Sequence, residues 1–224
     1  MLILSFSTGT EPGKWFMRFR ERTHHGGLET LDSDDALGEM LEGKAQLALT
    51  RLPDARIDEN LHVVELYSEN PGVAFPKDYF LAAEEGDVDP AELQGEIINW
   101  EIPESGEVNA AEVRAALQIV AANVGIVIAP RPLIKVLSKK LVEHRNLKGG
   151  KKTTIALVWK KSEDNEEIQD FVGIARGRTA NSSRQQTVKR SAREKTLAKQ
   201  ARKQAEKPKG SRSNQGRKAP RKRR

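Results

Sequence analysis

The first 51 residues alternate short apolar segments with helical ones, and this alternation limits the fold more than any other feature of the chain. Residues 2–6 predict a strand, and the segment after them predicts a helix with Trp15 on its apolar face. A second strand at 28–31, a helix between Ser33 and Gly43 and a third strand at 45–51 follow. Such an order favours parallel strands joined by right-handed crossovers, and therefore an α/β domain.

The helix ends carry their own signals. Thr10 is a suitable cap for the first helix, with Pro12 in its first turn, and Ser33 is a suitable cap for the second. Gly43 is the expected stop of the second helix.

The alternation of extended and helical segments continues after residue 51. We expect extended segments at 61–66, 71–76, 95–100, 126–129 and 154–159, with helices over 108–123, 133–141 and the acidic segment that starts near Glu163.

Charge divides the chain sharply after Arg176. Residues 1–176 hold 20 Lys or Arg and 30 Asp or Glu, whereas residues 177–224 hold 18 Lys or Arg and two Glu. We therefore expect an acidic folded body, 1–176, and a basic, largely disordered tail, 177–224. Ser191 and Glu194 have capping-box spacing, which indicates a nascent helix at 191–206 within that tail.

The composition points to a cytoplasmic protein. No cysteine occurs, which excludes disulfides and thiolate chemistry and fits a reducing compartment. The first residues lack the basic start of a signal peptide, and no segment has the apolar length of a membrane span.

Four segments, in order, resemble the effector-binding (substrate-binding) domain of LysR-type transcriptional regulators. They are LETLDSDDALGEMLEGKAQLALTRLP at 28–53, LHVVELYSENPGVAFPKDYFLAA at 61–83, VAANVGIVIAP at 120–130 and TIALVWKKSEDNEEIQDFVG at 154–173. The resemblance covers nearly all of the body and implies a two-lobed, periplasmic-binding-protein-like fold of type II. It implies lobe I at about 1–73 and 151–176, lobe II at about 74–148, and a hinge near 73–76 and 147–154.

The chain also departs from that family. The sequence starts at the first strand of the effector domain, so we expect no winged helix-turn-helix. The stretch between Trp100 and Val113 is short, which predicts a trimmed cleft wall, and Gln46 stands where the family usually has an acidic residue.

The resemblance places a ligand site between the lobes. Ser7, Thr8 and Thr10 follow the first strand at a helix start, where free N–H groups suit a small anionic metabolite. Thr50 and Arg51 end the third strand, and Asn99 and Trp100 are expected to face them from lobe II. The threonines as helix caps and Trp100 as a packing residue are an equally good interpretation.

We predict neither an enzyme nor a metal or cofactor site. His24 and His25 have no carboxylate at a helical ligand spacing, and LKGGKKTT lacks the leading glycine of a phosphate-binding loop. No serine or threonine has the glycine elbow of a nucleophile.

The tail predicts loose, salt-sensitive contact with nucleic acid or ribosomes, because polycations release counterions from phosphates. No aromatic residue follows Phe171, so the tail offers no base stacking. The expected contact residues are Lys189, Arg190, Arg193, Lys195, Lys199, Arg202, Lys203, Arg217, Lys218, Arg221, Lys222, Arg223 and Arg224. A solubilising arm, or one that folds back on the body, is the simpler interpretation.

Two function classes remain open. The first is a ligand-binding module of transcription regulation, paired as a homodimer as the resemblance implies. The second is a nucleic-acid- or ribosome-associated accessory protein with a vestigial cleft. No membrane partner is expected, because the tail has only Leu197 as a large apolar anchor.

Overall fold

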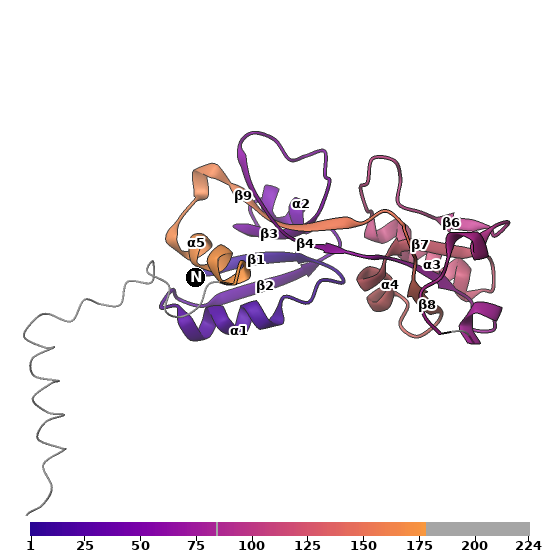
Figure 1. Cartoon of the computed structure of the whole chain (residues 1–224). Coiled ribbons are helices and arrows are strands. Elements are labelled where there is room, and N and C mark those ends of the chain that lie inside the picture. Colours follow the sequence, from indigo (N-terminus) through magenta and orange to yellow (C-terminus); the bar gives the residue numbers. More distant parts are fainter. Residues whose placement is uncertain (84, 178–224) are drawn as a thin grey trace, which may run out of the picture. The chain divides into compact units, whose positions relative to one another are not determined.

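The computed structural model describes residues 1–83 and 85–177, all of which belong to one compact unit, Met1–Thr179. Its backbone forms two sheets, each covered by helices, so the predicted two-lobed α/β fold is confirmed (Figure 1). The basic tail, including the helix expected at 191–206, lies outside the described residues.

Lobe I is built on a five-stranded sheet with the order β2-β1-β3-β9-β4. Its strands are β1 (Leu2–Ser7), β2 (Leu28–Ser33), β3 (Leu47–Leu52), β4 (Leu61–Glu69) and β9 (Thr153–Lys160). β1 pairs in parallel with both β2 and β3, as predicted, while β9 runs antiparallel between β3 and β4.

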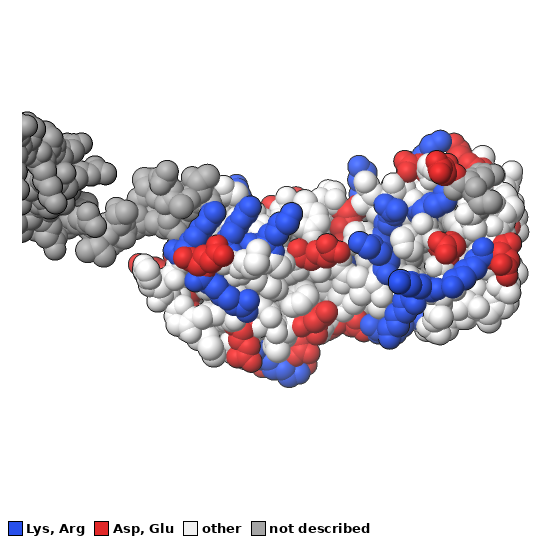
Figure 2. Space-filling model, turned by 90° about the horizontal axis from the view of Figure 1, so that it is seen from below, with Lys and Arg blue, Asp and Glu red and all other residues white. Residues whose placement is uncertain are grey.

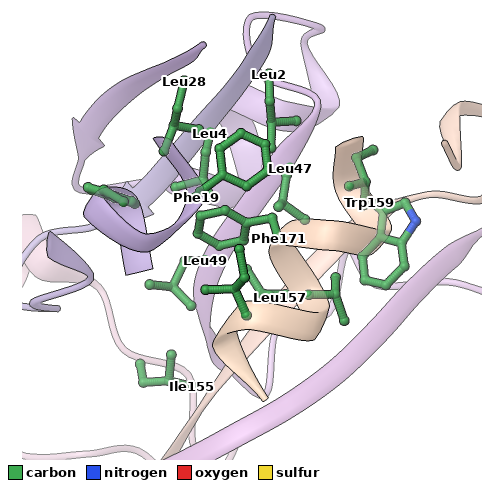
Figure 3. Packing of buried hydrophobic residues seen from close by; sticks show 14 residues of the cluster. Leu2, Leu4, Phe19, Leu28, Leu47, Leu49, Ile155, Leu157, Trp159 and Phe171 are labelled. Atoms are coloured by element: carbon green, nitrogen blue, oxygen red, sulfur yellow. The ribbon is translucent and has the colours of Figure 1, made fainter. Parts of the chain in front are cut away.

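Helices cover both faces of this sheet. α1 (Gly13–Arg22) and α5 (Glu166–Ala175) pack on one face, and α2 (Ala36–Leu41) packs on the other. The rings of Phe19 and Phe171 meet at a centroid distance of 5.6 Å in the centre of the first core (Figure 3). The period-2 pattern of β1 sends Leu2 and Leu4 into that core.

Lobe II is built on a four-stranded sheet with the order β6-β7-β5-β8. Its strands are β5 (Pro71–Phe75), β6 (Ile98–Trp100), β7 (Ile126–Pro130) and β8 (Glu143–Asn146). α3 (Ala110–Ala121) and α4 (Arg131–Leu137) cover one face, and the 3₁₀ turns η1 (Phe80–Ala83) and η2 (Pro90–Leu93) belong to the other.

Two chain segments join the lobes. Asn70 alone separates β4 from β5, and the segment after Asn146 returns the chain to β9. The first hinge segment was expected near 73–76. Residues 71–75 already pair with β7 and β8 of lobe II, so the chain crosses between the lobes before Val73.

Several local predictions were wrong. Ser33 does not cap α2, because Asp35 accepts the hydrogen bond from the Gly38 N–H. Thr10 does not cap α1, since its hydroxyl donates to the Ser7 carbonyl oxygen at 2.7 Å.

The segment after β7 also differs from the prediction. α4 ends at Leu137, not near 141, because Lys139 and Lys140 adopt left-handed φ values of 46° and 65°. The polar strand β8 was not predicted, and the 3₁₀ turn η3 (Lys161–Glu163) precedes α5, so Glu163 lies before that helix.

Gln46 stands where an acidic residue was expected from the resemblance. Its side-chain oxygen accepts a hydrogen bond from the Ile3 N–H at 2.9 Å.

Candidate functional site

A cavity of about 450 Å³ lies between the two lobes. Its lobe I wall comes from the ends of β1 and β3, the start of α2 and the loop after β3, and its lobe II wall from the start of α3. The lining residues are Ser7, Asp34, Asp35, Thr50, Arg51, Pro53, Asp54, Ala55, Arg56, Glu107, Val108, Asn109 and Ala110.

Three of the seven predicted ligand residues line this cavity: Ser7, Thr50 and Arg51. All three are buried, because they sit at the ends of the central strands β1 and β3. The carboxyl ends of parallel strands thus meet at the cleft, as expected for an open α/β sheet.

Arg51 is neutralised by Glu69. Its Nε and Nη2 atoms donate to the two carboxylate oxygens of Glu69 at 2.8 and 3.2 Å, and its Nη1 donates to the Thr8 carbonyl oxygen. Thr153 donates its hydroxyl to the same carboxylate. Both charged side chains are almost completely buried, with exposed fractions of 7% and 1%, so Arg51 has no free charge to offer an anion.

Thr8 and Thr10 lie beside the cavity but are not part of its lining. Thr8 donates its hydroxyl to the Asp32 carboxylate at 3.0 Å, and Thr10 bonds back to Ser7. Each hydroxyl therefore has a local structural partner.

Asn99 and Trp100 belong to lobe II and do not line the cavity either. Asn99 donates to the Val124 carbonyl oxygen, and Trp100 donates its indole N–H to Glu112. The structure does not bring these two residues together with Thr50 and Arg51 at this cavity.

Arg56 forms a cluster with two carboxylates at the cavity mouth. It bonds both oxygens of Asp35 at 2.7 Å and those of Asp54 at 2.6 to 2.9 Å. Its hydrogen bonds lower the pKa of the Asp35 carboxyl against the opposing effect of partial burial. Sequence reasoning missed this cluster, although the doublet Asp34-Asp35 before an apolar helix carried the capping signal.

Two further contacts join the walls of the cavity. Arg114 on α3 forms a bidentate pair with Asp34, with the Nη2 and Oδ1 atoms 2.9 Å apart. The Ala55 N–H donates to Glu107 at 2.7 Å. The Arg114 hydrogen bond lowers the pKa of the Asp34 carboxyl. These contacts hold lobe I to the start of α3.

No metal centre emerges in the part of the chain that the structure describes. Residues 1–83 and 85–177 contain no group of three or more His, Asp or Glu side chains arranged to hold a metal ion. In the same ranges, no helix has the length and apolar character needed to cross a membrane.

Solved structures share this fold. The effector-binding domain of a BenM variant matches with a TM-score of 0.59 at 16% identity, over 78% of this chain and 92% of that one. CbnR, a LysR-family transcriptional regulator, matches with a TM-score of 0.59 at 15% identity, over 78% of this chain and 68% of that one.

Full-length BenM carrying the E226K mutation matches with a TM-score of 0.58 at 16% identity, over 78% of this chain and 66% of that one. The chain thus spans about two thirds of the whole regulator. No protein-family model matches the chain, and no curated protein matches its sequence. The fold is the two-lobed fold of LysR-type effector-binding domains.

Proposed function

We propose that this chain is an effector-binding regulatory module that takes a small ligand in the cavity between its lobes. The observation that supports it best is the cavity itself, which lies where the ends of β1 and β3 meet the start of α3. Its volume of about 450 Å³ suits a metabolite.

The ligand class follows from the charges of the lining. An anionic group, as the sequence predicts, would have to displace Asp35 and Asp54 from Arg56, which is 44% exposed, because Arg51 is buried in its pair with Glu69. Binding at Arg56 would release Asp35 and Asp54, which then need a positive or hydrogen-bond-donating partner. A small ligand that carries both a carboxylate and an ammonium group satisfies both requirements.

Thermal unfolding against a metabolite panel tests this proposal. A ligand at 100 times its Kd stabilises the folded state by about 2.7 kcal/mol, which raises Tm by about 5–10 °C for a domain of this size. Zwitterionic ligands should give the largest shifts, and Arg56→Gln should reduce them. The matched control is Arg18→Gln, because Arg18 is an exposed residue of α1 away from the cavity lining.

We also propose that the basic tail, residues 177–224, contacts nucleic acid through its lysines and arginines. The support is the charge count of 18 basic to two acidic residues. Binding of labelled RNA and DNA over a salt series, with the full chain and a chain ending at Gly177, tests it. Equal salt dependence of the two forms would contradict the proposal.

A nucleic-acid-associated accessory role with a vestigial cleft is the second candidate. It is favoured by the pairing inside the cavity, where the charged side chains described above already have partners. Absence of any thermal shift across the panel, together with strong polyanion binding, would support it. Pairing into a homodimer stays a prediction, which sedimentation of the full chain would test.

A further inference from the structure

The acidic body contains a strongly basic region in lobe II. Residues 131–152, which span α4, β8 and the loop after it, hold eight Lys or Arg and only one acidic residue, Glu143. Figure 2 looks onto the underside of the molecule as drawn in Figure 1, and Lys and Arg side chains form bands across that face of both lobes. The distribution of charge is therefore uneven in a body of net acidic composition.

Two of these eight cations have structural roles. Arg145 donates to the carbonyl oxygens of Leu81, Glu85 and Gly86, and Lys151 donates to backbone oxygens of the loop before α3. Four of the remaining six line surface cavities.

These two cavities lie next to each other beside the hinge. The first, of about 380 Å³, includes Arg131 and Lys135 in its lining, and the second, of about 570 Å³, includes Lys148 and Lys152. Asn70 and Asn146 line both cavities, so the two are adjacent. We call the surface of the two cavities together the hinge groove; its charged and aromatic lining residues are Tyr67, Arg131, Lys135, Lys148 and Lys152 with the acidic Glu11, Glu69 and Asp87, and Asn70 and Asn146 lie between the cavities.

Acidic side chains offset only part of its charge. Glu69 is buried and paired with Arg51. Asp87 lines the second cavity and keeps its negative charge, because the Asn146 amide that donates to it is neutral. Glu11 lies 3.6 Å from Lys135, but both are largely exposed, with fractions of 78% and 65%, and such pairs are weak.

The other cations have no acidic partner. In the described ranges, no hydrogen bond or ion pair holds the charged ends of Arg131, Lys148 or Lys152. Burial, and after it the positive charge of Arg131, lowers the pKa of the neighbouring His144.

An aromatic side chain lies at the edge of the groove. Tyr67 is 39% exposed, and its ring centroid is 6.3 Å from that of Trp15. Cations and amide donors beside an exposed aromatic ring are the combination that binds single-stranded nucleic acid, with phosphates on the charges and a base stacked on the ring. A second copy of this chain fits poorly, because a two-fold contact would place like charges against each other.

We propose that the hinge groove binds single-stranded nucleic acid, with Arg131, Lys135, Lys148 and Lys152 on the phosphates and Tyr67 stacked on a base. This inference rests on neither the ligand cavity nor the tail. It adds base stacking, for which the tail has no aromatic residue.

Fluorescence anisotropy with the full chain tests the groove, using labelled oligo(U) and oligo(dT) of about 20 nucleotides. The double variant R131Q/K135Q should reduce the slope of log K against log salt by about 1.4, since each contact contributes about 0.7 on a single strand. Tyr67→Ala should weaken binding at fixed salt by about fivefold or more, and Tyr67→Phe should retain it.

The matched control for the charge variant is K77Q/K161Q. These lysines follow the far ends of β5 and β9, strands about 13 and 23 Å long that start beside the groove, and neither lysine lines it. Their loss should leave the affinity close to that of the original chain.

Photo-crosslinking with a 4-thiouridine oligonucleotide locates the contact directly. An adduct at or next to Tyr67 would support the proposal. Wild-type affinity and slope in both R131Q/K135Q and Tyr67→Ala, with adducts only in residues 177–224, would overturn it and assign binding to the tail alone. An equal loss of affinity for the oligonucleotide in Tyr67→Phe and Tyr67→Ala would also overturn the stacking role of Tyr67.

Discussion

The Arg51–Glu69 pair offers the sharpest test of how this fold is held together. It joins the end of β3 to the end of β4, one residue before the chain crosses into lobe II. Glu69→Gln keeps the shape of the side chain but leaves the buried guanidinium without its countercharge. Removal of one partner of a buried pair costs about 3–5 kcal/mol, which corresponds to a fall in Tm of about 6–20 °C for a domain of this size.

Urea unfolding followed by circular dichroism, with Arg51→Met and the double variant R51M/E69Q, completes the measurement. The double variant should be more stable than Glu69→Gln alone, because no uncompensated charge remains, and the coupling free energy should exceed about 1.5 kcal/mol. Glu65→Gln, an exposed change on the same strand, should stay within about 0.5 kcal/mol. The reasoning that this pair is shielded from water and strongly coupled would be refuted by either of two results. One is a decrease in the free energy of unfolding of less than about 1 kcal/mol in Glu69→Gln, and the other is additive effects of the two single substitutions.

Two smaller changes probe the contact between the lobes. Gly9→Ala places a Cβ 2.9 Å from the Leu133 Cα, so it should destabilise the fold. Gly43 has a similar positive φ, but a Cβ there meets no atom within 4 Å, so Gly43→Ala should destabilise the fold less. Equal decreases of the urea midpoint in the two variants would contradict this. Asp34→Asn removes the pair with Arg114 and should cost about 0.2–1 kcal/mol near neutral pH. Because the folded-state pKa of Asp34 is lowered, its contribution is present above its unfolded pKa of about 3.9 and is lost as the pH falls through the lowered value. The Asn variant should therefore match the original chain in acid, and a difference that persists at about pH 2 would argue against the ion pair as its source.

The order of strands and helices was predictable from the sequence because apolar periodicity records which face each element buries. The parallel pairs β1–β2 and β1–β3 follow from that order. β8 was missed because its four residues, EHRN, are polar and form an edge strand that buries no side chain completely.

The candidate site was predicted only in part. Thr50 and Arg51 were placed at the cleft because the end of a strand is visible in sequence. The partner of Arg51 was not predicted, since Glu69 is 18 residues away along the chain and meets it only after β9 has brought β3 and β4 together. Capping was also misplaced, because Ser33 and Asp35 are both good cap residues and only the backbone geometry selects one.

The position of β9 has a consequence for synthesis on the ribosome. Among the strands that the structure describes, β4 has β9 as its only neighbour in the sheet, yet β9 follows all of lobe II in the chain. Translation at about 5–20 residues per second therefore leaves β4 without a partner strand for about 5–18 s after it is made. During that interval the backbone edges of β3 and β4 are open to other chains, and all of lobe II has been synthesised before β9 can close the sheet of lobe I.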